Sequence, residues 1–152
     1  MATACELRRV GAVKTVGILD CYAHYGDCTG DIINRLNIDW VKHRTLGGGC
    51  DGGGEAFRRW LLKSVDAMQH WDLILYQAGA DPHIDDPLGG ILTTEEMRWR
   101  DRVVAQAIAK RAMVWNLAGG YQKPVTQPDG LVIDPVLELH THTLIEMIEA
   151  NR

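Results

Sequence analysis

The sequence lacks two features that would place the protein in a membrane or an oxidising compartment. Its four cysteines form no CxxC pair, so a disulfide framework or a structural zinc knot is disfavoured and we interpret them as reduced thiols. They are Cys5, Cys21, Cys28 and Cys50. The longest apolar run is far shorter than the roughly 20 residues of a membrane span, and the first residues show no charged-then-apolar signal pattern. We therefore expect a cytoplasmic protein without membrane contact.

An excess of basic charge is also lacking. The chain has 16 Lys and Arg against 20 Asp and Glu, a formal net charge of -4, and Arg8 with Arg9 forms only a short basic run. Binding of nucleic acid through phosphate neutralisation is therefore disfavoured. With 152 residues, 46% of them hydrophobic, the chain can bury one core, and we predict a single domain over residues 1–152.

The glycine-rich segment 47–54 lacks the features of a known phosphate-binding loop. It has neither a Lys-Ser/Thr ending nor GxGxxG spacing. The two interpretations are a phosphate cradle and a mobile loop. We favour the mobile loop, because glycine by itself only widens the choice of backbone conformations.

Three continuous apolar runs predict buried strands. They are Val16–Leu19, Leu73–Tyr76 and Met113–Leu117, and residues 41–46 form a weaker fourth candidate. Continuous rather than alternating apolarity is typical of strands that are covered on both faces of a parallel sheet.

Helical patterns lie between and after these runs. Apolar residues recur at three- and four-residue spacings from about Glu55 to Gln69. Thr93 and Glu96 form a capping box ahead of a second helix, and Asp134 followed by Pro135 is a start signal for a C-terminal helix. Strands that alternate with helices predict an α/β fold with a parallel sheet.

Polar residues gather where the apolar runs end. Because ligands bind beyond the carboxyl ends of parallel strands, we expect these residues to surround one crevice. Imidazole, carboxylate and phenol groups together favour a divalent metal with a hydroxyl that stabilises an oxyanion. Alternatively, the aspartates cap loops and the first histidine is a core residue. The residues are Asp20, Tyr22, His24, Asp81, His83, Asp85, Asp86, Gly119, Gly120 and Tyr121.

Several segments resemble the histone deacetylase and acetylpolyamine deacetylase superfamily. Residues 17–29 resemble its first metal-binding segment, and residues 76–89 are closely similar to its second metal-binding loop. Residues 92–102 match the helix start that follows, and residues 117–121 resemble its glycine-tyrosine motif. The order of the segments is that of the C-terminal half of the family domain. The resemblance implies an arginase-like, three-layer α/β fold whose mostly parallel sheet has helices on both faces.

The resemblance also implies roles for individual residues. His24 and Asp81 would be zinc ligands, and Tyr121 would be the catalytic phenol that binds the scissile carbonyl. Asp20 would lie behind the ligands or in a neighbouring monovalent-cation site. The implied reaction is hydrolysis of an acylated amine, in which zinc activates water and polarises the amide.

Two departures from the family pattern put this activity in question. Tyr22 stands where the family has an aspartate ligand, and a neutral phenol is a poor zinc ligand, so zinc should bind weakly or not at all. Cys21 and Cys28 are unfavourable substitutes. The family's paired general-base histidines lie in a half with no counterpart here. His83 is the alternative base, but we interpret it as a solvent-exposed loop histidine.

These features predict a truncated or degenerate deacetylase-like protein that is weakly active or inactive by itself. Three hypotheses remain: a metal-dependent deacylase completed by another chain, a non-catalytic binding or scaffold protein, and a folded remnant. Met113–Leu117 should be an edge strand, because the family pairs it with a strand of the other half. Apolar edges attract further chains, so we predict a homodimer or a partner chain covering residues 113–117. An acylated amine is the expected small-molecule ligand.

Overall fold

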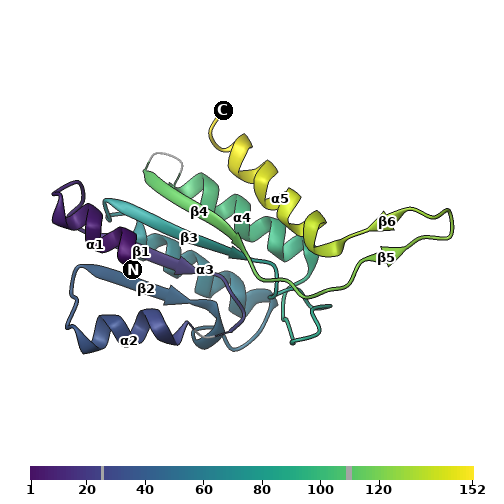
Figure 1. Cartoon of the computed structure of the whole chain (residues 1–152), viewed down its shortest axis with the longest axis horizontal. Helices are drawn as coiled ribbons and strands as arrows, with labels where there is room; N and C mark the ends of the chain where they lie inside the picture. The colour runs from purple at the N-terminus through teal and green to yellow at the C-terminus, as the bar shows by residue number, and fades with distance from the viewer. Residues whose placement is uncertain (25, 109–110) are drawn as a thin grey trace.

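The computed structural model describes residues 1–24, 26–108 and 111–152, apart from the side chain of residue 108. Its centre is a sheet of four parallel strands in the order β2-β1-β3-β4, so that β1 and β3 are central (Figure 1). The strands are β1 (Val16–Asp20), β2 (Val41–Thr45), β3 (Leu73–Gly79) and β4 (Ala112–Ala118). All four predicted strands are therefore present, and the predicted parallel arrangement is confirmed.

Helices cover both faces of this sheet. Helices α1 and α2 pack on one face of the sheet through a small apolar cluster. Helices α3, α4 and α5 pack on the other face, where the main core lies. In Figure 1, α3 and α4 lie behind the sheet and a short hairpin, β5–β6, projects beyond it. The helices are α1 (Ala2–Arg9), α2 (Asp27–Arg35), α3 (Gly54–Met68), α4 (Thr94–Ile108) and α5 (Pro135–Glu149), and the hairpin strands are Val125–Thr126 and Val132–Ile133.

The main core forms because alternate residues of the central strands point to the same side. Leu19 of β1 and Tyr76 of β3 are both buried on the side of the α3 helix, where they meet Phe57 and Leu61. Full burial of a side chain of this size contributes about 1.5–3 kcal/mol each to folding. The strand residues that point to the other face of the sheet, such as Val16, pack against α1.

The helix starts that the sequence predicts are present. Thr93 Oγ1 accepts the Glu96 N–H at 3.2 Å and the Glu96 carboxylate accepts the Thr93 N–H at 2.9 Å, which is a complete capping box. Asp134 accepts the N–H groups of Val136 and Leu137 at the start of α5. The glycine-rich segment contains a short 3₁₀ turn, Leu46–Gly48, and then starts α3 at Gly54.

One prediction about β4 is wrong. Its continuous apolar run predicts a strand that is covered on both faces, yet Val114 is 57% exposed and Leu117 is 39% exposed. Met113 and Trp115 pack on the main core, so only one face of the strand is covered. β4 lies at the sheet edge, as predicted for residues 113–117. None of the helices in the described ranges is long and apolar enough to cross a membrane.

Candidate functional site

The carboxyl ends of β1, β3 and β4 meet at one rim of the sheet. β1 ends at Asp20, which is in register with Gln77 of β3, and Gly79 at the end of β3 is in register with Ala118 of β4. The loops that follow these strands therefore start side by side. The predicted site residues lie on these loops or at the strand ends.

His24 and Asp81 are in direct contact at this rim. His24 Nδ1 lies 3.0 Å from Asp81 Oδ2, and the same oxygen accepts the Ala23 N–H at 2.9 Å. The Asp81 side chain is buried, whereas the His24 side chain is 47% exposed at the surface of the rim. Burial raises the pKa of the Asp81 carboxyl, and the hydrogen bonds from Ala23 and His24 oppose that rise.

The second oxygen of Asp81 has no hydrogen-bond partner within the part of the chain that the structure describes. Asp81 Oδ1 is nevertheless fully buried. A carboxylate normally has both oxygens hydrogen-bonded when it is buried, because an unpaired charged acceptor loses its hydration without replacement. Asp81 therefore has an oxygen that is free to accept a further partner at this rim.

Tyr22 and Tyr121 form a phenol pair beside His24 and Asp81. Their hydroxyl oxygens lie 2.5 Å apart, and the Tyr22 ring lies 5.2 Å from the His24 ring between centroids. The hydrogen bond to Tyr121 raises the pKa of Tyr22 above its ordinary value, and burial and the nearby Asp81 charge add to this. These contacts favour the protonated form of the Tyr22 hydroxyl.

Asp20 lies behind the pair and does not touch His24. Its Oδ1 accepts the Tyr22 N–H at 3.1 Å and the Gln77 amide at 3.2 Å. Burial raises the pKa of the Asp20 carboxyl to about 6, with a smaller contribution from the Asp81 charge. The geometry gives Asp20 a supporting position that shapes the loop carrying Tyr22.

Gly119 permits the close approach of these groups. Its φ is +60°, and a Cβ at this position would lie 2.4 Å from the Tyr22 ring and 2.9 Å from Asp81 Oδ1. The backbone of the glycine-tyrosine segment therefore lies directly against both side chains. Only glycine supplies this conformation and this clearance together.

Asp86 holds Tyr121 in place, a role that sequence reasoning did not assign. Asp86 is 5% exposed, and its Oδ2 accepts the Tyr121 N–H at 2.9 Å while Oδ1 accepts the Leu88 N–H at 3.0 Å. The Asp-Pro sequence at 86 and 87 is a turn signal that indicates the Leu88 contact. The longer-range bond to Tyr121 leaves no such local signal.

Behind the rim, Arg100 anchors the end of β3 from inside the core. Its Nη1 donates to the Gly79 carbonyl at 2.7 Å, and its Nε donates to Asp101 at 2.9 Å. Asp101 also accepts hydrogen bonds from the Tyr76 and Thr143 hydroxyls. This cluster fixes the strand end that leads into Asp81.

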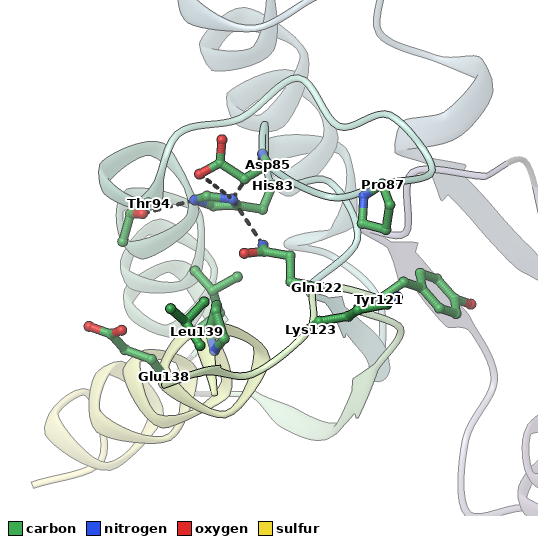
Figure 2. Close-up of a pocket in the computed structure, with 11 residues that line it drawn as sticks. His83, Asp85, Pro87, Thr94, Tyr121, Gln122, Lys123, Glu138 and Leu139 are labelled. Carbon is green, nitrogen blue, oxygen red and sulfur yellow. Dashed lines mark hydrogen bonds and ion pairs between the residues drawn. The ribbon is translucent and has the colours of Figure 1, made fainter. Parts of the chain in front are cut away.

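His83 is buried, so its interpretation as a solvent-exposed loop histidine is wrong. It is 6% exposed; its Nδ1 accepts the Asp85 N–H and a Gln122 amide N–H, and its Nε2 therefore carries the proton and donates to Thr94 Oγ1. It borders a cavity of about 480 Å³, and Figure 2 shows the Tyr121 ring pointing away from this imidazole. His83 thus faces a different space from His24 and has no geometry for a base at the rim.

The rim residues do not fit a catalytic zinc. Such a zinc takes three protein ligands plus an open position for water, and no group of three His, Cys, Asp or Glu side chains suited to a metal occurs among the described residues. His24 and Asp81 supply two ligand groups, and the third position carries the Tyr22 phenol, bonded to Tyr121. Cys21 is buried in the main core, which rules it out as the replacement.

The architecture defines an α/β protein of the arginase/deacetylase fold. It is similar to acetylpolyamine aminohydrolase from Burkholderia pseudomallei, with a TM-score of 0.60 and 14% identity over 91% of this chain and 45% of that chain. It is also similar to Helicobacter pylori arginase, with a TM-score of 0.52 and 11% identity over 88% of this chain and 43% of that chain.

These likenesses confirm the predicted fold, and at such identities they show the fold alone. The chain spans less than half the length of either of these proteins. Neither a family model nor a curated protein sequence matches the chain.

Proposed function

We propose that this chain is a degenerate deacetylase-like protein that does not hydrolyse acylated amines by itself and acts by binding. The observation that carries the proposal is the phenol pair. The Tyr22 ring lies against Gly119 and beside the buried Asp81 oxygen, and its hydroxyl is bonded to Tyr121. The position that would hold a third ligand is therefore filled, and the catalytic phenol is engaged with a neighbour.

The test measures metal content and turnover on the same samples. Purified protein should contain well under one zinc per chain and release no acetate from acetyl-lysine or acetylpolyamine. Tyr22→Asp adds the third carboxylate and should raise zinc affinity by about tenfold or more, because three protein ligands are the usual catalytic set. It should not restore turnover, since the general base remains missing from the rim.

Tyr22→Phe is the matched control, because it removes the hydroxyl bonded to Tyr121 without adding a ligand. It should leave zinc content unchanged. Thermal unfolding of all three proteins would check that they are folded. Native protein with about one zinc per chain and steady acetate release would refute the proposal.

A second candidate function is a deacylase completed by another chain. Its support is that Asp81 Oδ1 is buried without a hydrogen-bond partner among the described residues, as a carboxylate would be that is kept for a metal. The discriminating result is acetate release that appears only when a second protein is added. The same zinc measurement, made with and without that protein, would then show metal uptake on association.

We also propose that a second copy of this chain covers the β4 edge. Support comes from the edge position of the strand and from Val114, which is 57% exposed on the face opposite Met113 and Trp115. Val114→Lys should shift the mass measured by light scattering towards the monomer, because a charge on an apolar strand face opposes association. Lys substitution of Leu62, 52% exposed on α3, is the control that should leave the mass unchanged. A monodisperse monomer of the native chain at micromolar concentration would argue against the dimer.

A further inference from the structure

A recess at the β2 edge of the sheet collects positive charge although the chain as a whole is acidic. It has a volume of about 550 Å³ and lies between the end of β2, the glycine-rich segment and the α3 helix. Lys and Arg supply three of its nine lining residues, and Asp and Glu supply none of those the structure describes. β2 is the edge strand opposite β4 (Figure 1), and none of the rim residues Tyr22, His24, Asp81 and Tyr121 lines this recess.

Unpaired polar atoms occur on the β2 residues that line this recess. Among the described residues, five side-chain nitrogen or oxygen atoms are buried without a hydrogen-bond partner. Three of the five are His43 Nε2, Arg44 Nε and Thr45 Oγ1, all of which belong to lining residues. Buried polar groups are normally paired, because an unmade hydrogen bond costs more than a made one contributes. Side chains alternate along a strand, so Arg44 projects to the α3 side with Leu19, its partner in register, whereas His43 and Thr45 project to the opposite face. Of the three atoms, Arg44 Nε is therefore the one on the side of Arg59 and Lys63, and it points to an anionic ligand that pairs with it.

The charged side chains around these atoms are free to meet an anion. Arg44 and Lys63 form no ion pair with the residues that the structure describes, and Arg59 has only a long contact of 3.9 Å to the exposed Glu55. Arg59 and Lys63 are four residues apart on α3, so they project from the same face of the helix. Two guanidinium groups and one ammonium group border a space that no Asp or Glu side chain lines within the described ranges.

The glycine-rich segment forms one wall of the recess. A Cβ at Gly49 would lie 2.6 Å from the Thr45 carbonyl and 2.6 Å from Trp60 Nε1. The loop can approach the strand and the indole this closely only because the residue is glycine. The segment thus has a packing role beside the cations, which its sequence did not indicate, and the recess lies at the carboxyl end of β2, where open parallel sheets bind ligands.

We propose that this recess binds the phosphate group of a small phosphorylated molecule. Arg44 and Arg59 supply the planar donors that phosphate oxygens accept in pairs, and Lys63 adds a point charge. The Trp60 indole N–H is a further donor at the wall that Gly49 forms. A recess of this size accommodates more than one phosphate, and a small ligand suits a chain whose net charge of -4 opposes long polyanions.

The experiment is calorimetric titration of the full chain with pyrophosphate at low salt, where surface screening is weakest. Arg44→Gln and Lys63→Gln should each weaken binding by roughly tenfold or more, because each removes a charged hydrogen-bond donor. Arg35→Gln is the matched control: it makes the same charge change on α2, where its side chain is 81% exposed and outside the recess. It should leave the affinity within about twofold of the native value.

Several outcomes would overturn the proposal. They are no pyrophosphate binding by the native chain, or the same loss in Arg35→Gln as in Lys63→Gln. Lys63 is exposed on the helix surface, so its variant keeps the test valid should Arg44→Gln fail to fold. Sedimentation with phosphatidylglycerol vesicles, lost on Lys63→Gln, would assign the phosphates to a lipid surface and refute a small-molecule ligand.

Discussion

Asp101 and Asp81 are both 1% exposed, but one is fully paired and the other is not. Asp101 accepts hydrogen bonds from Arg100, Tyr76 and Thr143, so its charge is matched by a guanidinium. Asp81 accepts from Ala23 and His24 through one oxygen only, and its other oxygen is bare. Behind the sheet rim the buried carboxylate has its hydrogen-bond partners, whereas at the rim one oxygen of Asp81 has none among the described residues. Two equally buried carboxylates of one strand end and the helix behind it therefore differ in how far their charge is compensated.

The largest expected effect on stability comes from removing the guanidinium that pairs with the buried Asp101. Arg100→Met should lower the free energy of unfolding by about 3–5 kcal/mol, because it leaves the buried Asp101 charge uncompensated. Urea unfolding would measure the loss. Arg9→Met is the control, since Arg9 pairs with Glu6 at the surface with 70% of its side chain exposed, and it should cost less than about 1 kcal/mol. A loss below that bound for Arg100→Met would show that the network is not what holds the rim.

Gly119 lies against Tyr22 and Asp81 in the rim region, and its substitution should have the next largest effect. Gly119→Ala forces a Cβ into the left-handed conformation and against the Tyr22 ring, for a loss of about 2 kcal/mol. Gly130 is the control, because it also has positive φ but no atom within 4 Å of a Cβ. Gly130→Ala should therefore lose only the conformational part, about 1 kcal/mol. Equal losses in urea unfolding would mean that the contact with Tyr22 carries no strain.

The sequence predicts the elements that bury a regular apolar face. β1, β3, α3, α4 and α5 have strong periodic or continuous apolar patterns, and their capping residues act within a few positions of themselves. It does not predict α2, because this helix buries no residue and contains Gly30, which disfavours a helix interior by about 1 kcal/mol. The sequence does not predict the β5–β6 hairpin either, since its strands are two residues each and lack a buried face.

The candidate site divides in the same way. Strand ends and parallel order are enough to predict that His24, Asp81 and Tyr121 meet at one rim, because adjacent parallel strands end at the same edge. Which atoms pair across the rim depends on contacts far apart in the sequence, such as Asp86 with Tyr121 or Arg100 with Gly79. The apolar run of β4 likewise predicts burial but cannot say what lies on each face.

Asp20 offers a test of the rim through pH. Its folded-state pKa of about 6 is above the ordinary 3.8, so its protonated form is favoured by folding. This contribution is full below the unfolded pKa and is lost as pH rises through about 6. Relative to Asp20→Asn, which cannot titrate, the native chain should therefore gain on the order of 1 kcal/mol in unfolding free energy between about pH 7.5 and about pH 4.5.

The measurement is the urea midpoint of both proteins at the two pH values. His43 lies on the neighbouring strand, and burial lowers its pKa, but its titration is common to both proteins and largely cancels in the difference. A stability difference between the two proteins that stays constant with pH, or that changes with the opposite sign, would show that folding does not raise the pKa of Asp20.

The smallest effect on stability is expected at Asp81, which the same substitution compares directly with Asp101. Asp81→Asn loses a charged acceptor for Ala23 and His24 but also removes a buried carboxylate whose ionised form burial disfavours. The two changes oppose each other, so the free energy of unfolding should change by less than about 1 kcal/mol. Asp101→Asn, the same chemical change in the paired region, should cost about 3 kcal/mol or more because Arg100 then lacks its counter-charge. If both variants lose equal stability in urea, Asp81 is a structural carboxylate like Asp101, and its bare oxygen is no trace of a former ligand.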